Sequence, residues 1–318
     1  MSDDQHKIIP FPHNDEHHLQ LGSQALRAGE FTEAVNHFQA AYQTQHTFAV
    51  NRQLAEALLH AGDAAQGVAV AQEFIDGYAR TLTDGLLYSH LLIESGEFVS
   101  AQEWLVSLRE QAHSAEDQAR LSELTTLFAD RQKAFIKDHA ADIAAITKRF
   151  AGLGGLKSSE QAGLINTIGQ LTVPTFNQIA PRLMTDPFIN QALRNTVALH
   201  YVTLADDQPR TLLWFDETVH FVPSEVPDPF NNAITDVWNQ ATDDAQNDDP
   251  GAALIMTQEL RLYQLLLFPR LAEVVDAPAE WAEAVRMRIT NPDKPLITAP
   301  AIKQWLTKLD DVLDGMND

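Results

Sequence analysis

Apolar residues recur at steps of three and four along the first third of the chain, in stretches that meet in pairs at a glycine. The three glycines, Gly29, Gly62 and Gly96, are separated by 33 and 34 residues. The apolar positions are Leu19, Leu21, Ala25 and Leu26, then Phe31, Ala34, Phe38 and Ala41, in the first pair; Leu54, Ala55, Leu58 and Leu59, then Val68, Ala71, Phe74 and Ile75, in the second; and Leu87, Tyr88, Leu91 and Leu92, then Phe98, Ala101, Leu105 and Leu108, in the third. Such steps place side chains on one face of a helix, so each pair predicts two amphipathic helices.

The junction within each pair has the same composition in all three copies. The segments RAGE, HAGD and ESGE each place an acidic residue directly after the glycine. Glycine is the usual residue at the end of a helix, and an acidic residue suits the start of the next one. A period near 34 residues therefore predicts three helical hairpins, which is about the minimum that can stack into a continuous core.

This spacing resembles the tetratricopeptide repeat (TPR) over about residues 15–115. The small-residue positions of the family match Gly22, Ala34, Ser89 and Ala101, and its large apolar positions match Leu21, Phe38, Tyr88 and Leu105. The middle copy keeps Leu54 and Ala55, but it has Gly67 and Ala71 where the family prefers alanine and a large apolar side chain. The usual tryptophan and closing proline of the family are absent. The alternative is an ordinary helical bundle whose periodicity is accidental.

The remaining sequence predicts more helices and one hairpin. Residues 115–150 have the pattern of one long amphipathic helix that covers the last repeat, and helices are predicted at about 158–171, 174–184, 187–205, 228–245, 252–272, 278–289 and 300–313. The acidic segment DDAQNDDPG, residues 243–251, is predicted to be a loop. The segment PRTLLWFDETVHFVP predicts a β-hairpin near residues 210–222. If Phe215 faces Thr218, then Leu212, Trp214, Val219 and Phe221 share one buried face.

These elements predict an all-α chain, namely a TPR-type α-solenoid followed by a helical C-terminal domain with one small β-hairpin. The expected boundaries are an extended segment at 1–14, repeats at 15–115, a connecting and capping helix at 116–150, and the C-terminal domain at 151–318. The whole arrangement resembles bacterial TPR proteins that begin with an IIPFP-type segment and carry a helical C-terminal extension. That resemblance implies an interaction module.

Composition narrows the classes of partner. The 318 residues are 45% apolar, and 44 acidic residues against 22 basic ones give a formal charge of −22. Such a charge repels phosphate backbones and anionic lipids, which disfavours nucleic acid and membrane partners. No cysteine is present, so disulfides and thiol chemistry are excluded. Because no apolar stretch approaches the roughly 20 residues of a membrane helix, a cytoplasmic protein is expected.

Three short motifs offer chemistry, and each has a simpler explanation. HNDEH, with His13, Glu16 and His17, matches the pattern of one zinc-peptidase group, but it stands at a helix start and lacks a third ligand. GLGGLKSS places Leu156 between the last glycine and Lys157, which breaks the phosphate-loop pattern. DDAQNDDPG lacks the spacing of a calcium loop. The sequence therefore predicts no catalytic residue, no metal site and no cofactor.

The resemblance to the tetratricopeptide repeat implies that the first helix of each hairpin lines a concave binding surface. Its inward-facing positions correspond here to Leu19, Ser23, Leu26 and Arg27, to Arg52, Glu56, Leu59 and His60, and to Leu86, His90, Ile93 and Glu94. The arginines offer planar donor groups to a carboxylate of a bound peptide. The alternatives are that these residues are exposed scaffold, or that the IIPFP segment of the chain covers them.

The predicted function is a non-enzymatic adaptor or scaffold that binds a protein or peptide on this surface. Two other functions are weighed against it. One is a peptide-sensing regulatory protein that acts on another protein, and the other is a zinc-dependent hydrolase that uses His13, Glu16 and His17. The sequence gives no reason to name one partner or one oligomeric state.

Overall fold

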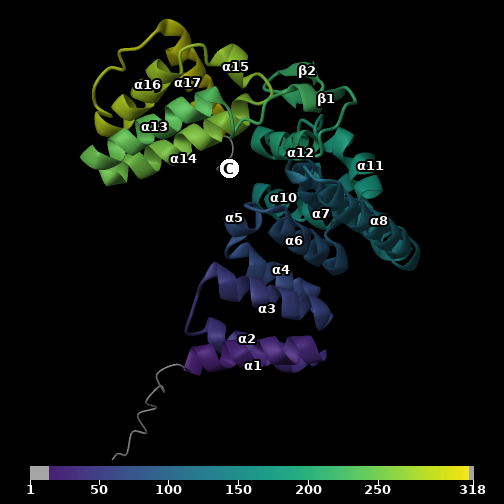
Figure 1. Cartoon of the computed structure of the whole chain (residues 1–318). Helices are drawn as coiled ribbons and strands as arrows, with labels where there is room; N and C mark the ends of the chain where they lie inside the picture. Colours follow the sequence, from purple (N-terminus) through teal and green to yellow (C-terminus); the bar gives the residue numbers. More distant parts are fainter. Residues whose placement is uncertain (1–13, 315–318) are drawn as a thin grey trace, which may run out of the picture. The chain divides into compact units, whose positions relative to one another are not determined.

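The computed structural model describes residues 14–314 and shows two compact units (Figure 1). Of the described residues, the first unit comprises 14–140 together with Gly169–Val173, and the second comprises Ala141–Ile168 and 174–314. Within the described residues the chain is helical apart from one two-stranded antiparallel hairpin. The predicted fold class, an all-α chain of TPR-like helical hairpins followed by a helical part with a β-hairpin, is confirmed.

The first unit is a stack of helices in which each one packs on the next, as the lower part of Figure 1 shows. Its helices are α1 (Asn14–Ala28), α2 (Phe31–Tyr42), α3 (Phe48–His60), α4 (Ala64–Gln72), α5 (Ile75–Tyr78), α6 (Leu82–Ser95), α7 (Phe98–Ser107) and α8 (Ala115–Asp138). The pairs α1 and α2, α3 and α4, and α6 and α7 are the three predicted hairpins. The short helix α5 lies between the second hairpin and the third.

The three glycines of the repeat end the first helix of each hairpin. Gly29, Gly62 and Gly96 have φ angles of 78°, 80° and 84°, in the left-handed region that side chains other than glycine rarely adopt. The acidic residue that follows has a smaller role than expected. Of Glu30, Asp63 and Glu97, Asp63 alone caps its helix through the side chain, which accepts from the backbone N–H of Gln66 at 3.3 Å.

Small residues occupy the positions where paired helices touch. Gly22, Ala34, Ala55, Gly67, Ser89 and Ala101 are all buried. A Cβ atom added at Gly67 would lie 2.4 Å from Cδ2 of Leu91, which is far inside van der Waals contact. The middle copy therefore has a residue smaller than the alanine that the family prefers, and the missing Cβ atom leaves room for the Leu91 side chain of α6 against α4.

The space between the helices is filled by apolar side chains and one buried polar network. The larger cluster includes Ala55, Val68, Tyr78, Tyr88, Leu91, Leu92, Phe98, Leu105 and Phe128, and a second one includes Ala25, Phe38, Leu54 and Leu58. Within the stack Asn51 is fully buried. Its amide accepts from the Tyr78 hydroxyl at 2.9 Å and donates to the Tyr42 hydroxyl at 3.0 Å and the Val70 carbonyl at 2.6 Å. These bonds satisfy the amide and fix how α3 sits against α4 and α5.

The predicted single helix over residues 115–150 is wrong. The structure has two helices there, α8 ending at Asp138 and α9 (Ala140–Ala151). His139 between them has φ −115° and ψ 28°, outside the helical region. Aspartate and histidine are poor residues for a helix interior, and their low helix propensity favours a break at this point. The apolar pattern continues across the break, which is why periodicity alone did not show it.

The second unit contains short helices, the hairpin, and a layer of longer helices. These elements are α9, α10 (Ser158–Ile165), α11 (Val173–Leu183), α12 (Gln191–Thr203), β1 (Arg210–Trp214), β2 (Glu217–Phe221), α13 (Ala233–Asp248), α14 (Pro250–Leu267), α15 (Leu271–Val274), α16 (Pro278–Thr290) and α17 (Pro300–Asp314). The predicted acidic loop at 243–251 is wrong. Helix α13 continues to Asp248, and Asp249 caps α14 by accepting from the N–H groups of Gly251 and Ala252, each at 3.0 Å.

The β-hairpin has the predicted buried face and a different register. Trp214 pairs with Glu217, so the turn is Phe215–Asp216 and the predicted pairing of Phe215 with Thr218 is wrong. Leu212, Trp214, Val219 and Phe221 are buried on one face, as expected. Phe215 has a φ of 50°, its N–H donates to Oε1 of Gln191 at 2.8 Å, and its ring lies 5.6 Å from that of Trp305. These contacts hold Phe215 in the turn, although phenylalanine is not a residue that such a turn usually contains.

Buried polar side chains of α12 anchor the elements around it. The amide nitrogen of Asn195 donates to the carbonyls of Leu265 and Phe268 at 2.7 and 2.9 Å. The guanidinium of Arg194 donates to the carbonyl of Leu213 at 2.9 Å and to that of Ile189. Carbonyls at the end of α14 and in β1, which have no partner within their own element, are thereby satisfied.

Candidate binding surface

The expected binding residues lie on α1, α3 and α6, the first helices of the three hairpins. We call the set Leu26, Arg27, Arg52, Glu56, Leu59, His60 and His90 the first-helix surface. Leu26 packs into the apolar cluster that contains Leu54 and Leu58 of α3. Two of the predicted residues do not belong to the set, since Leu86 and Ile93 are only 8% and 2% exposed. They are core residues of α6, so the prediction that they lie on the binding surface is wrong.

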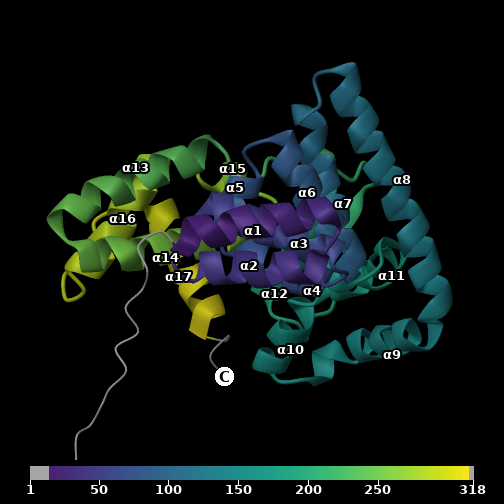
Figure 2. The same ribbon diagram turned by 60° about the horizontal axis from the view of Figure 1, so that its bottom comes forward.

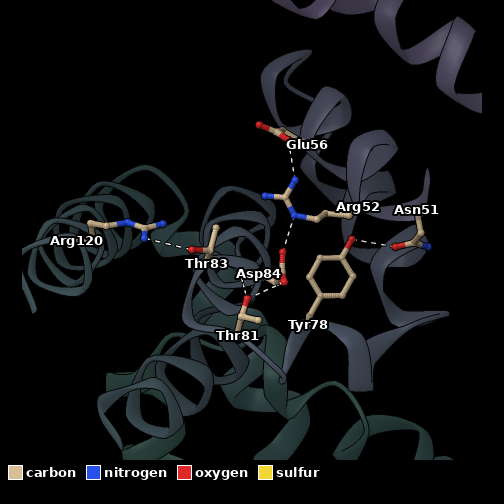
Figure 3. Close-up of polar contacts among 8 residues, drawn as sticks. All are labelled: Asn51, Arg52, Glu56, Tyr78, Thr81, Thr83, Asp84 and Arg120. Carbon is tan, nitrogen blue, oxygen red and sulfur yellow. Dashed lines mark hydrogen bonds and ion pairs between the residues drawn. The ribbon is translucent and has the colours of Figure 1, made fainter. Parts of the chain in front are cut away.

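Arg52 is the centre of an ion-pair network between two hairpins, drawn in Figure 3. Its Nε atom donates to Oδ1 of Asp84 in α6 at 2.5 Å, and Nη1 lies 3.4 Å from Oε2 of Glu56. The other carboxylate oxygen of Asp84 accepts from the Thr81 hydroxyl at 2.7 Å. Arg52 therefore has partners within the chain, and its ion pair with Asp84 joins α3 to α6.

A second polar cluster joins α6 to α8. The Nε atom of Arg131 donates to Oε1 of Glu94 at 2.9 Å, and His90 lies 3.7 Å from the same oxygen. Near the start of the same two helices, Arg120 donates to the Thr83 hydroxyl at 3.2 Å (Figure 3). Polar contacts near both ends of α6 thus connect it to α8.

The electrostatics of this cluster affect His90. Burial lowers the pKa of His90 from its ordinary value of 6.5, and the charges of His60 and Arg131 lower it further, while Glu94 acts in the opposite direction. The neighbouring His60 is exposed, and its ring stacks on that of Phe31 with the centroids 5.1 Å apart. The two imidazoles therefore lie close enough to influence each other across α3 and α6.

Sequence reasoning missed Thr83, Asp84, Arg120 and Arg131. A signal for the last two was present, because α6 begins at Leu82 and α8 begins at Ala115, which is 115 − 82 = 33 residues later. By position, α8 is the first helix of a fourth repeat. The prediction of one capping helix over residues 115–150 did not include the equivalence of α8 to α6. It therefore also missed the polar side chains of α8.

The motifs with possible chemistry are dispersed in the structure. His13 lies outside the described residues, and Glu16 and His17 are exposed on α1. Among residues 14–314 no group of three or more His, Asp and Glu side chains is placed to hold a metal ion. The GLGGLKSS segment forms a 3-10 turn (Leu153–Gly155) and the start of α10, and Lys157 is the residue before the first helical one.

The stack of helical hairpins with a polar face defines a TPR-like helical repeat architecture. The chain is similar to a TPR repeat-containing protein, YsoA, of Bacillus subtilis (strain 168), with 21% identity over 288 residues that cover 88% of this chain and 84% of the relative. No family model matches the chain, and no solved structure matches it. In the part of the chain from Asn14 to Asp314, no helix is long and apolar enough to cross a membrane.

We predict that Arg52 and Asp84 stabilise the first unit as a coupled pair. The side chains are 31% and 14% exposed, so the pair is only partly screened by solvent. In a double-mutant cycle, Arg52→Gln and Asp84→Asn should show a coupling of about 0.5–1.5 kcal/mol in the free energy of unfolding in urea. The exposed Arg109 is the matched control, because Arg109→Gln combined with Asp84→Asn should be additive. Additivity of the Arg52 and Asp84 variants would show that the pair does not hold the hairpins together.

We also predict that His90 makes the fold less stable in acid. A histidine with a lowered pKa binds fewer protons when folded than when unfolded, so stability falls as the pH drops below about 6.5. The melting temperature of the wild type should therefore fall more between pH 7.5 and pH 5.5 than that of His90→Gln. His113→Gln, which removes an exposed imidazole of the same unit, should behave like the wild type. Equal losses in the wild type and His90→Gln would contradict the proposed burial effect.

Proposed function

We propose that the chain is a non-enzymatic adaptor that binds a protein or peptide partner on the first-helix surface and acts in the cytoplasm. The observation that carries the proposal is the repetition itself. Three successive hairpins present equivalent helices, of which α1 and α3 each offer a half-buried leucine and polar groups, and α6 offers His90. A surface built from repeated units suits an elongated ligand such as a peptide, because each repeat can contact a successive part of it.

The chemistry of the surface favours a ligand with both polar and apolar side chains. Leu26 and Leu59 are half-buried and offer apolar contact, while Arg27 and His60 are exposed. The network around Arg52 contributes carboxylates as well as a guanidinium. A mixed surface of this kind supports recognition by hydrogen bonds with a few apolar anchors, and it gives no reason to prefer a strongly acidic partner.

The similarity to the TPR repeat-containing protein supports the adaptor proposal at the level of architecture. In this proposal residues 15–115 form the binding module, 116–150 cap it, and 151–318 form a second module. A capping role for α8 is supported by one contact. Its residues Leu121 and Leu124 pack on Leu82, Leu86 and Leu108 of the third hairpin. The segment at 1–14, with its IIPFP motif, lies almost wholly outside the described residues.

The proposal is tested by affinity purification of the tagged full-length chain from native cells, with quantitative mass spectrometry of the proteins retained. Arg27→Glu and His60→Ala each change an exposed side chain of the first-helix surface, so folding should be preserved. We expect each variant to lower recovery of the specific partner by at least about fivefold.

Arg109→Glu is the matched control, since Arg109 is exposed in the same unit on the turn after α7. It should retain the partner at the wild-type level, and circular dichroism should show the same helix content for all variants. If Arg27→Glu and His60→Ala retain every specific partner as well as Arg109→Glu does, the partner binds elsewhere and the proposal fails.

A further inference from the structure

A groove of about 650 Å³ lies on the second unit between α13 and α16, with α14 beneath it. These three helices pack against one another, and they lie side by side in both views (Figure 1, Figure 2). All of the lining residues belong to the second unit. The groove is separate from the first-helix surface, and the adaptor proposal makes no use of it.

The lining residues of α13 follow the period of the helix. Asp236, Gln240, Asp244 and Asp248 recur at every fourth position along the outer side, and Val237, Ala241 and Ala245 form the adjacent row. The distance from residue 236 to residue 248 is 12 residues, or about 18 Å along a helix axis. The groove is therefore long enough for about three turns of a helix laid along it.

The floor of the groove is apolar, and its side chains are alanines apart from Met256. Ala245, Met256 and Ala282 are buried, and Ala241 and Ala279 also line the groove. Val237 at the edge is 38% exposed. Small floor residues permit close approach of another backbone, and the exposed Val237 at the edge favours an apolar contact.

The rim carries an excess of negative charge. Four carboxylates line the groove, those of Asp236, Asp244, Asp248 and Glu283, against one guanidinium, that of Arg286. Arg286 is bound to Glu283 through two contacts of 2.7 Å, so its charge is already matched within α16. The three aspartates of α13 still form a row of net negative charge beside the apolar floor, although Asp248 also interacts with the charge of Arg286 and Asp244 accepts from the Gln240 amide at 2.9 Å. Such a row attracts a cationic ligand and repels nucleic acids and anionic lipids.

We propose that this groove is a second docking site, and that it binds an amphipathic helix of a partner protein with a small or aliphatic seam flanked by lysine or arginine. The seam would lie over Ala241, Ala245 and Ala282, and the basic side chains would reach Asp244 and Asp248. A helix fits better than an extended peptide, because helix ridges pack into the spaces of a row with a four-residue period. No edge strand is available at this groove for an extended peptide to join.

The proposal is tested with a synthetic helical peptide of about 18 residues built from lysine, alanine and leucine, with leucine and alanine on one face. Binding to the full-length chain is measured by fluorescence anisotropy. The site is located by NMR of a chain labelled at the alanine methyl groups. We expect the largest shifts at Ala241, Ala245, Ala279 and Ala282.

Two variants separate docking from general attraction to an acidic chain. Asp244→Lys reverses one rim charge, and Asp243→Lys makes the same change at a neighbouring exposed residue that does not line the groove. We expect Asp244→Lys to weaken binding at least about tenfold and Asp243→Lys to weaken it less than about threefold. Ala241→Phe fills the groove without a change of charge, and it should weaken binding as much as Asp244→Lys does.

Three outcomes would overturn the proposal. Equal losses for the two lysine variants would show attraction to the net charge alone, and retention of binding by Ala241→Phe would show that the floor is not contacted. Methyl shifts confined to alanines outside the groove would place the peptide elsewhere. Salt sensitivity decides nothing by itself, because any cationic peptide bound to this chain would show it.

Discussion

The close contact of paired helices at small buried residues is the constraint on which the first unit depends. Gly22 and Ala34, Ala55 and Gly67, and Ser89 and Ala101 recur at equivalent positions, and each pair lets two helices approach until the larger apolar residues around them are covered. Since isolated hairpins of this size would leave much apolar surface in water, the stack is stable only when neighbouring hairpins fit together. The left-handed glycines set where each helix ends, and the small residues set how near the next helix comes.

This close packing also decides which polar groups reach the surface. Arg52 and Asp84 belong to different hairpins, and they meet at 2.5 Å because α3 and α6 are held side by side. The same applies to Glu94 and Arg131 on α6 and α8. An arginine that sequence reasoning assigns to a ligand is thus already used inside the protein. The residues left for a partner are the exposed ones at the edges of these networks, above all Arg27 and His60.

The sequence predicts what repeats or alternates, and it predicts poorly what depends on contacts between distant segments. The three hairpins, their glycine ends and the buried face of Leu212 and Trp214 all follow from period and pattern. The register of the β-hairpin does not, because Gln191 and Trp305 hold Phe215 in the turn from far along the chain. Among the expected binding residues, Leu86 and Ile93 have the right helical spacing but are buried in the core, and the role of the others stays a prediction. The groove beside α13 was missed because residues 243–248 were expected to be a loop.

The central claim, that close helix contact at the small residues holds the stack together, is tested most directly by the urea unfolding of Gly67→Leu. A Cβ atom at this position would lie 2.4 Å from Cδ2 of Leu91, which is fully buried, so a leucine requires either the packed Leu91 side chain or α4 itself to move. We predict a loss of at least about 2 kcal/mol in the free energy of unfolding. Gly163→Leu, where a Cβ atom would meet nothing within 4 Å, should be neutral or slightly stabilising. A Gly67→Leu protein as stable as the wild type would contradict the account.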